Sequence, residues 1–436
     1  MMMLSYYFDL ALRSFKSSRG LTALMLLTIA MGVAACMTTL TVFHVLSGDP
    51  IPSKSRQLFN IQLDASPMRG YKPGNEPNLQ LTRFDAENLL REARADKQVM
   101  MSGGNVPITP PQAGQQPFIA LSRNTSADFF PMFEVPFLYG KGWTAEDDKS
   151  EARVAVISKS LNERLFGGID SRGKTLRVRD KDITIVGVMN DWRVVPRYFD
   201  LTNGAFSRID DIYIPFSTAM VLRFGISGNF QCWGDPAGGD ARALNAPCSW
   251  IQYWAQVDSP EKARNYRAYL NQYSEQQRSS GRFERPSNVR MRDVMTWLKQ
   301  QQVVPEDIGL QLWLAFGFLA VCLTNTVGLQ LAKALRRSGE IGVRRALGAP
   351  RRQIFAQFLV EAGSLGLLGG LLGLGLTWLG VQAVRVGASN YGSLIQMDSL
   401  MLLSTLGLAL VASLIAGILP AWRACQVTPA LQLKSQ

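Results

Sequence analysis

Residues 21–46 read LTALMLLTIAMGVAACMTTLTVFHVL and contain no Asp, Glu, Lys or Arg. Three further runs without these residues follow toward the other end of the chain, at 308–332, 362–384 and 399–422. A helix needs about 20 consecutive apolar residues to cross the hydrocarbon core of a bilayer. Each run is long enough, so the sequence predicts four transmembrane helices and excludes a wholly soluble protein.

The average composition hides these runs. Of the 436 residues, 47% are hydrophobic and 18% are charged, which is ordinary for a soluble globular protein. The average is ordinary because residues 47–306, between the first and second runs, carry most of the charged side chains. We therefore expect a membrane protein with four helices and one large α+β domain outside the bilayer.

Lys and Arg outnumber Asp and Glu by 46 to 34, which gives a net charge of +12. Such an excess could indicate nucleic-acid binding, but here most of it lies in short segments beside the apolar runs, where only Asp9 and Glu340 oppose it. By the positive-inside rule, both termini and the loop 333–353 are cytoplasmic and residues 47–306 are periplasmic, in a bacterial inner membrane. No nucleic-acid partner is expected. The basic residues concerned are Arg13, Lys16, Arg19, Lys333, Arg336, Arg337, Arg344, Arg345, Arg351, Arg352, Arg423 and Lys434.

The expected order is a segment 1–46, a periplasmic domain 47–306 and a part 307–436 with three membrane helices. The first segment opens with apolar side chains at helical spacing, which predicts an amphipathic helix in contact with membrane lipids. These side chains are Leu4, Tyr7, Phe8, Ala11, Leu12 and Phe15. The first apolar run could be a cleaved signal peptide, but it continues ten residues past Cys36, which favours a retained signal anchor.

The periplasmic domain mixes strand and helix patterns. A helix is predicted at 82–95, with Thr82 as its N-cap, and another from Ser259 onward, with a cap and a proline at its start. A third helix is expected at 159–166. Apolar runs and period-two alternation predict strands at 56–64, 154–157, 175–179, 182–189, 211–215 and 250–258.

Residues 217–250 are expected to form an insertion subdomain, because most of this segment is rich in Gly, Pro, Asn and Ala with little periodicity. Cys232 and Cys248 lie in it, and the other cysteines fall in predicted membrane or cytoplasmic segments. An oxidising compartment favours a disulfide between the two, which would contribute roughly 3 kcal/mol of stability. Two unpaired thiols are the alternative.

One segment matches a nucleotide-binding pattern. The sequence GIDSRGKT from Gly168 to Thr175 fits G-x4-G-K-[ST], but a working P-loop follows a strand and opens a helix. Here a helical pattern precedes the match and a strand pattern follows it, so we interpret it as a coincidence. The sequence also lacks a metal-ligand cluster and a G-x-S-x-G motif. We expect no enzyme activity in the chain itself and no bound cofactor or metal.

The third apolar run is rich in glycine. Gly366 and Gly370, like Gly369 and Gly373, are four residues apart, a spacing that lets helices approach closely. Packing within one chain explains these glycines at least as well as a seam between two subunits. Glu361 immediately precedes the run and is expected to face protein or to reach toward the cytoplasmic surface.

The cytoplasmic loop reads EIGVRRALGA from Glu340, followed by Gln353-Ile354. Together with the glycine-rich run, it resembles the permease core of the MacB/FtsX-type permeases of ABC transporters, in which Glu361 matches a usual acidic position. PAWRA at 420–424 and TPA at 428–430 resemble the C-terminal ending of that family. Motifs at 129–130, 137–142, 154–158, 165–168, 173–176 and 185–188 resemble the MacB-type periplasmic core domain.

The resemblance implies four membrane helices per subunit and pairing with a second permease subunit, identical or different. It also implies that the cytoplasmic loop couples to an ABC ATPase, which binds the ATP. Only about 20 residues precede the first apolar run, so a separate ATPase is expected. Carried over position by position, the coupling residues are Glu340, Arg344, Arg345, Ala346, Gly348 and Arg351.

The expected function is that of an ABC permease subunit for efflux, in which ATP-driven motion rearranges the periplasmic domains by mechanotransmission. A membrane-fusion adaptor and an outer-membrane channel would be further partners. The alternatives are a signalling subunit that controls a cell-wall hydrolase and a lipoprotein-release permease. Both would use the same coupling of the cytoplasmic loop to an ATPase.

Overall fold

The computed structural model describes residues 2–112, 114–304, 306–387 and 399–426, which form two compact units. The helical unit consists of Met1–Ser47 and Val304–Gln436, and the external domain consists of Gly48–Val303. Lys434, the TPA motif and most of the connection between the last two membrane helices lie outside the described residues.

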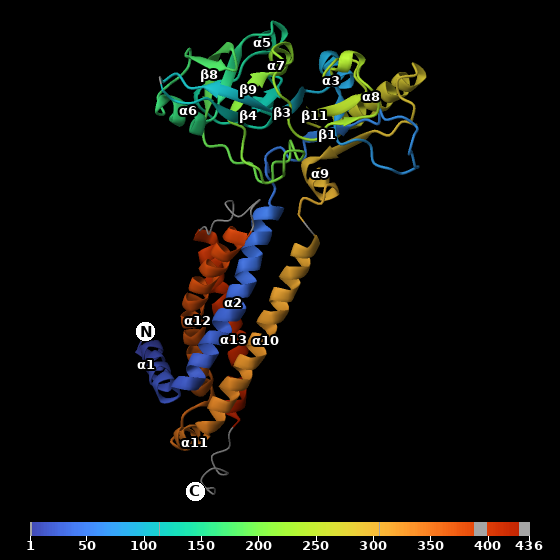
Figure 1. The fold of residues 1–436 in the computed structure, drawn as a ribbon. Coiled ribbons are helices and arrows are strands. Elements are labelled where there is room, and N and C mark those ends of the chain that lie inside the picture. The colour runs from blue at the N-terminus through green and yellow to red at the C-terminus, as the bar shows by residue number, and fades with distance from the viewer. Residues whose placement is uncertain (1, 113, 305, 388–398, 427–436) are drawn as a thin grey trace. The chain divides into compact units, whose positions relative to one another are not determined.

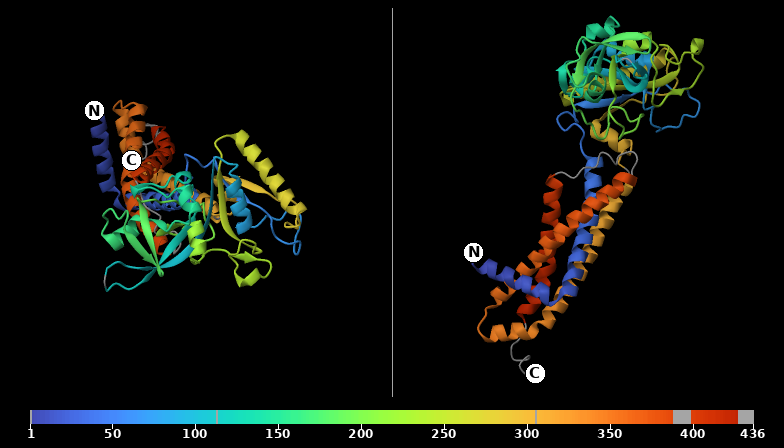
Figure 2. Two further views of the ribbon diagram at one scale, coloured as in Figure 1. Left: turned by 90° about the horizontal axis from the view of Figure 1, so that it is seen from above. Right: turned by 60° about the vertical axis from the view of Figure 1, so that its left-hand side comes forward.

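Within the described residues, four helices are long and apolar enough to cross a membrane, as the four uncharged runs predict. They are α2 (Arg19–Ser47), α10 (Glu306–Arg336), α12 (Arg351–Gly387) and α13 (Ser399–Cys425). Two shorter helices, α1 (Met2–Ser17) and α11 (Ser338–Ala346), lie at the end of the bundle where α2 and α12 begin (Figure 1). Helix α1 lies across the long helices rather than along them (Figure 2).

The glycine-rich part of α12 packs against two neighbouring helices of the same chain. A Cβ added at Gly370 would lie 2.9 Å from the Cβ of Ala409 on α13, and one at Gly366 would lie 2.8 Å from the Cβ of Ser413. On the neighbouring face, Gly369 approaches Ile29 of α2 and Gly373 approaches Ala30. Small residues at these positions let both partners come close, so the four glycines lie in seams within one bundle.

The external domain is built on a mixed sheet with the strand order β12-β1-β11-β3-β4-β9-β6-β8-β5. Strands β2 and β10 pair with β11, and β7 pairs with both β3 and β8. The pairs β4–β9 and β6–β8 are parallel, and the others are antiparallel. The strands are β1 (Leu58–Gln62), β2 (Leu81–Thr82), β3 (Lys97–Thr109), β4 (Phe118–Thr125), β5 (Phe137–Gly140), β6 (Val154–Ile157), β7 (Thr175–Val178), β8 (Lys181–Met189), β9 (Ile212–Pro215), β10 (Gln231–Cys232), β11 (Cys248–Gln256) and β12 (Arg290–Asp293). The helices are α3 (Arg83–Glu92), α4 (Phe129–Met132), α5 (Ala145–Lys149), α6 (Lys159–Phe166), α7 (Phe216–Val221), α8 (Pro260–Ser279) and α9 (Val294–Gln300).

Several of these elements begin where local chemistry predicts. The side chain of Thr82 caps α3, and that of Ser158 caps α6. Ser259 caps α8, with Pro260 in its first turn. A capping hydroxyl accepts a hydrogen bond from a backbone amide that the helix leaves unpaired. The strands predicted at 175–179 and 182–189 are confirmed as β7 and β8, which form an antiparallel hairpin.

Strands β3 and β4 form a long antiparallel pair that the sequence patterns do not predict. Gly103-Gly104 and Pro107 interrupt β3 and lower its local strand propensity. The glycines are nevertheless required, because a Cβ at Gly104 would meet the backbone oxygen of Gly225 and the hydroxyl of Ser122. The packing between segments therefore decides this strand, and its own propensity does not.

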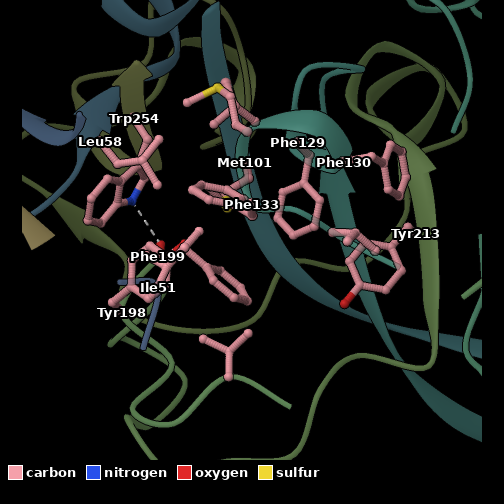
Figure 3. Close-up of a cluster of buried hydrophobic side chains, with 14 of the residues drawn as sticks. Ile51, Leu58, Met101, Phe129, Phe130, Phe133, Tyr198, Phe199, Tyr213 and Trp254 are labelled. Atoms are coloured by element: carbon pink, nitrogen blue, oxygen red, sulfur yellow. Dashed lines mark hydrogen bonds between the residues drawn. The ribbon is translucent and has the colours of Figure 1, made fainter. Parts of the chain in front are cut away.

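An aromatic core joins the first and last parts of the external domain (Figure 3). Its rings include Phe133, Tyr198, Phe199 and Trp254, and the indole N–H of Trp254 donates to the backbone oxygen of Phe199 at 3.1 Å. Ile51, close to the start of the domain, is buried in this core, as are Val294, Trp297 and Leu298 of α9, close to its end. Both chain connections to the helical unit are therefore anchored in one core.

Next to this core lies a buried ionic network, here called the Arg123 network. Its members are Arg123 on β4 and Arg197, Asp200 and Asp210 on the loop between β8 and β9. The guanidinium of Arg123 lies 2.7 Å from Asp200 and 2.9 Å from Asp210, and Arg197 lies 2.7 Å from Asp210. All four side chains are almost completely buried. The two arginines and two aspartates balance one another, which makes the burial of four charges tolerable.

The two aspartates of this network differ in pKa. Burial raises the pKa of Asp210 to about 6, although Arg123 opposes the shift. Burial would also raise the pKa of Asp200, but Arg123 and the hydrogen bonds that Asp200 accepts hold it below its ordinary value. The hydrogen bonds to Asp200 come from the side chains of Thr202, Asn203 and Gln252.

The segment 217–250 does not form a unit of its own, contrary to expectation. Helix α7 begins just before it and packs into the domain core, and β11 begins within it and pairs along the sheet. The irregular part lies between these two elements. There Cys232 and Cys248 form a disulfide and are paired opposite each other on β10 and β11.

Candidate functional site

Basic residues gather at one end of the helical unit, here called the basic end. It comprises α1, α11, the start of α2 and α12, and the last turns of α10 and α13. These elements carry all the basic residues predicted to be cytoplasmic that the structure describes. A bundle end so rich in Lys and Arg is typical of the cytoplasmic side of a membrane protein.

Helix α11 is seated on the bundle by a small apolar cluster. Ile341 is its buried anchor and packs with Ala334 of α10, Ile354 of α12 and Ala424 of α13. Helix α11 therefore touches three membrane helices at once. A displacement of α11 would be felt by all three, because close-packed side chains transmit strain.

Ion pairs hold the sides of α11. The Glu340 carboxylate lies 2.6 Å from Arg344 and 3.3 Å from Arg337, which precedes the helix. Arg344 also donates to the side-chain oxygen of Gln357 on α12 at 3.2 Å. These side chains, with Ile341 and hydrophobic residues of α12, line a small pocket between α11 and α12.

The end of α11 is tied to the last turn of α13. Arg345 donates to the backbone oxygen of Cys425 at 3.0 Å, and the thiol of Cys425 donates to the backbone oxygen of Arg351 at 3.3 Å. Of the six predicted coupling residues, Glu340, Arg344 and Arg345 thus contact the chain's own helices. The other three, Ala346, Gly348 and Arg351, are exposed.

The exposed face of α11 contains apolar residues that sequence reasoning missed. Val343 is 54% exposed and Leu347, directly after the helix, is 84% exposed. With Ala346 they form a strip at spacings of three and four residues. The signal was present in the sequence, since Ile341 and this strip lie on opposite faces of one short helix. It was masked by the density of arginines around it.

Glu361 on α12 is the centre of a second group of contacts, here called the Glu361 cluster. Its carboxylate lies 2.6 Å from the ammonium of Lys333 and 3.6 Å from the guanidinium of Arg337. The hydroxyl of Ser14 on α1 donates to it at 2.6 Å, and Arg337 in turn donates to that hydroxyl at 2.8 Å. Glu361 is 6% exposed, so it faces protein as expected. The sequence did not indicate which residues it would meet.

The segment that matches the P-loop pattern has a different structure. Helix α6 ends before it, and Gly167, Gly168 and Gly173 adopt positive φ angles in the turns that lead into β7. The segment therefore joins a helix to a strand, so that its backbone amides are not arranged at the N-terminus of a following helix. This is the reverse of the phosphate-binding order.

Two known families match most of this chain. Residues 22–273 match the MacB-like periplasmic core domain. Residues 312–429 match the FtsX-like permease C-terminal family. The second region contains α11, Glu361 and the glycine seams.

Curated relatives are similar over most of this chain. The macrolide export ATP-binding/permease protein MacB of Marinobacter nauticus is 24% identical, over 98% of this chain and 60% of that protein. The pyoverdine export ATP-binding/permease protein PvdT of Pseudomonas aeruginosa is also 24% identical, over 96% of this chain and 57% of that protein. The chain thus spans about three fifths of the length of these relatives. Among solved structures, the periplasmic region of MacB from Actinobacillus actinomycetemcomitans aligns with a TM-score of 0.37 and 13% identity, over 59% of this chain and 96% of that one.

Proposed function

The chain belongs to the family of MacB-like proteins with an FtsX-like permease region, and we propose that it is the permease part of an ABC exporter driven by an ATPase outside these 436 residues. The relatives are named as export proteins with ATP-binding and permease parts, and this chain matches about three fifths of their length. We propose that its substrate leaves from the periplasmic side. The proposed location is the bacterial inner membrane, with both termini in the cytoplasm.

The observation that carries this proposal is the construction of α11. Its buried face is fixed to three membrane helices, and its opposite face presents Val343, Ala346 and Leu347 beside exposed basic residues. An exposed apolar strip bordered by charge is typical of a protein-binding surface. We propose that the ATPase binds this strip, with Ala346, Gly348 and Arg351 at its edge. Glu340, Arg344 and Arg345 then hold the helix in place instead of meeting the ATPase directly.

The mechanism follows from how α11 is seated. When the ATPases close on ATP, they displace α11, and the seat at Ile341 passes that displacement to α10, α12 and α13. The glycine seams let α2 and α13 follow α12 as packed neighbours. The external domain receives the motion through α2 and α10, whose connections enter its aromatic core. A second permease subunit, an adaptor and an outer-membrane channel complete the proposed assembly.

The test is binding of the purified ABC ATPase from the same gene neighbourhood to the full chain in nanodiscs. Val343→Asp and Leu347→Asp place a charge in the apolar strip without touching the buried seat. Each is expected to weaken ATPase binding about tenfold or more, the usual effect of charging an apolar contact. ATP hydrolysis should lose its stimulation by the permease in parallel.

Val386→Asp is the matched control, because Val386 is an exposed valine near the far end of α12. It should leave ATPase binding unchanged. If Val343→Asp and Leu347→Asp bind the ATPase as the unaltered chain does, α11 is not the docking site and the proposal fails.

A further inference from the structure

The Glu361 cluster brings together parts of the chain that are far apart in sequence. Ser14 lies on α1, Lys333 and Arg337 lie at the end of α10, and Glu361 lies on α12. Arg337 continues the contacts to Glu340 at the start of α11. One carboxylate therefore joins the amphipathic helix, two membrane helices and the corner that carries α11.

The contacts of this cluster are close and mostly protected from water. The side chains of Lys333 and Glu361 are 6% and 9% exposed, and the ammonium of Lys333 also lies over the ring of Phe15 on α1 at 5.2 Å. A buried carboxylate with two cationic partners and one hydroxyl donor has its oxygens well satisfied. If that carboxylate lost its charge, Lys333 would remain buried without a counter-charge.

Helix α1 is held to the bundle in part by this cluster. Within the described side chains of α1, Ala11 and Ser14 are buried, whereas Phe8 is about half exposed. An isolated helix of this length is marginally stable in water, so α1 needs contacts with the rest of the chain. The hydrogen bond from Ser14 to Glu361 and the contact between Phe15 and Lys333 are two of these contacts.

We propose that Glu361 is a positioning residue that makes α1 and the α10–α11 corner move as one piece. This rests on the proposed function, in which the ATPase displaces α11. A displacement of α11 pulls on Arg337 through Glu340, and Arg337 passes it to Ser14 and Glu361 together. Helix α1 then shifts along the membrane surface with each ATPase cycle. It moves together with α11 instead of acting as a fixed anchor.

Hydrogen–deuterium exchange of the full chain in nanodiscs, followed by peptide mass spectrometry, tests this role. Glu361→Gln keeps the size and a hydrogen-bond acceptor but removes the charge. It is expected to speed exchange about tenfold in both α1 and α11, since local opening becomes easier. Ser14→Ala should speed exchange in α1 while leaving α11 close to the unaltered chain.

Glu340→Gln is the matched control, because the described ion pairs of Glu340 are to Arg337 and Arg344. It should affect α11 and leave α1 unchanged. Glu361→Asp keeps the negative charge between Lys333 and Arg337 and should keep α1 exchange to within about threefold of the unaltered chain. If Glu361→Gln and Ser14→Ala both leave α1 exchange unaltered, the proposal is overturned.

A second arm adds the ATPase with a non-hydrolysable ATP analogue. The unaltered chain should then show changed exchange in α1, and Glu361→Gln should not. If α1 of the unaltered chain does not respond although the ATPase binds, α1 is not a moving part and the inference fails. If the ATPase does not bind the unaltered chain, the proposed function fails, whereas the ATPase-free comparison still decides the role of Glu361.

Discussion

The Arg123 network of the external domain and the Glu361 cluster of the helical unit use the same residue types in opposite ways. In the first, two arginines and two aspartates balance and are almost completely buried around one loop. In the second, one glutamate meets a lysine and an arginine, and its contacts extend to Glu340, whose side chain is 46% exposed. The Arg123 network lies inside one domain, whereas the Glu361 cluster joins separate helices and is exposed to water on the side of Glu340.

The difference indicates what each set of charges does. Charges that are buried and balanced cannot rearrange without great cost, so the Arg123 network keeps the loop between β8 and β9 fixed beside the aromatic core. Charges that are partly hydrated can exchange partners at low cost. Arg337 and Glu340, at the open side of the Glu361 cluster, are partly hydrated in this way, whereas Glu361 and Lys333 are buried. The open side therefore suits a joint, and the Arg123 network suits a rigid body.

The largest effect is expected from breaking the Arg123 network. Asp200→Asn leaves Arg123 buried without one of its counter-charges and should destabilise the external domain by about 3–5 kcal/mol. Urea unfolding of the full chain in detergent, followed by tryptophan fluorescence, measures this, because Trp143, Trp192, Trp233, Trp250, Trp254 and Trp297 all lie in the domain. Asp191→Asn is the control, since Asp191 is 81% exposed beside Lys159 and should change stability by less than about 0.5 kcal/mol. Equal effects of the two variants would contradict the contrast.

Overpacking a glycine seam should have the next largest effect. Gly370→Val places side-chain atoms against Ala409 and Leu406 and should destabilise the bundle by about 1–3 kcal/mol. Gly375→Val lies on the same helix with open space around its Cβ and should cost much less. Titration with SDS, followed by circular dichroism, compares the two. A Gly370→Val bundle as stable as the Gly375→Val bundle would show that the seam is loosely packed.

The pH dependence of the stability of the external domain is a further test of the Arg123 network. The folded-state pKa of Asp210, about 6, is above the ordinary value of about 3.9, so this residue contributes stability that is complete below about pH 4 and is lost as the pH rises toward 6. The loss should be about 2–3 kcal/mol, since each pKa unit corresponds to about 1.4 kcal/mol. In Asp210→Asn the decline should be smaller by this amount when the same urea titration is repeated from pH 4 to pH 7, because Asp148, whose pKa burial also raises to about 6, still contributes. A decline of the same size in the variant would assign it to another group.

The smallest effect is expected at the open side of the joint. Arg344 and Glu340 are partly exposed, so Arg344→Gln should change the unfolding free energy of the bundle by about 0.5 kcal/mol, and the difference should vanish at high salt. SDS titrations at low and at molar salt measure this. Arg352→Gln, at an exposed position nearby on α12, is the control. A salt-independent loss of several kcal/mol would mean that the joint is as rigid as the Arg123 network.

The elements that local chemistry determines could be predicted from the sequence. The uncharged runs predicted the membrane helices, and Thr82 and Ser259 marked the starts of two helices in the external domain. Strand β3 could not be predicted, because its glycines lower local propensity and are needed only where another segment lies close. Likewise, no local pattern shows that Arg123, in a strand with polar neighbours, is completely buried.

The candidate site, too, could be predicted only in part from the sequence. The position and basic character of α11 followed from the sequence, because hydropathy and charge near a membrane act through composition over short windows. The partners of Glu361, the internal role of Arg344 and Arg345, and the exposed strip at Val343 and Leu347 depended on the tertiary structure. These contacts join residues on different helices, from 13 to 347 positions apart, and only the packing of the helices determines which side chains meet and which face remains exposed.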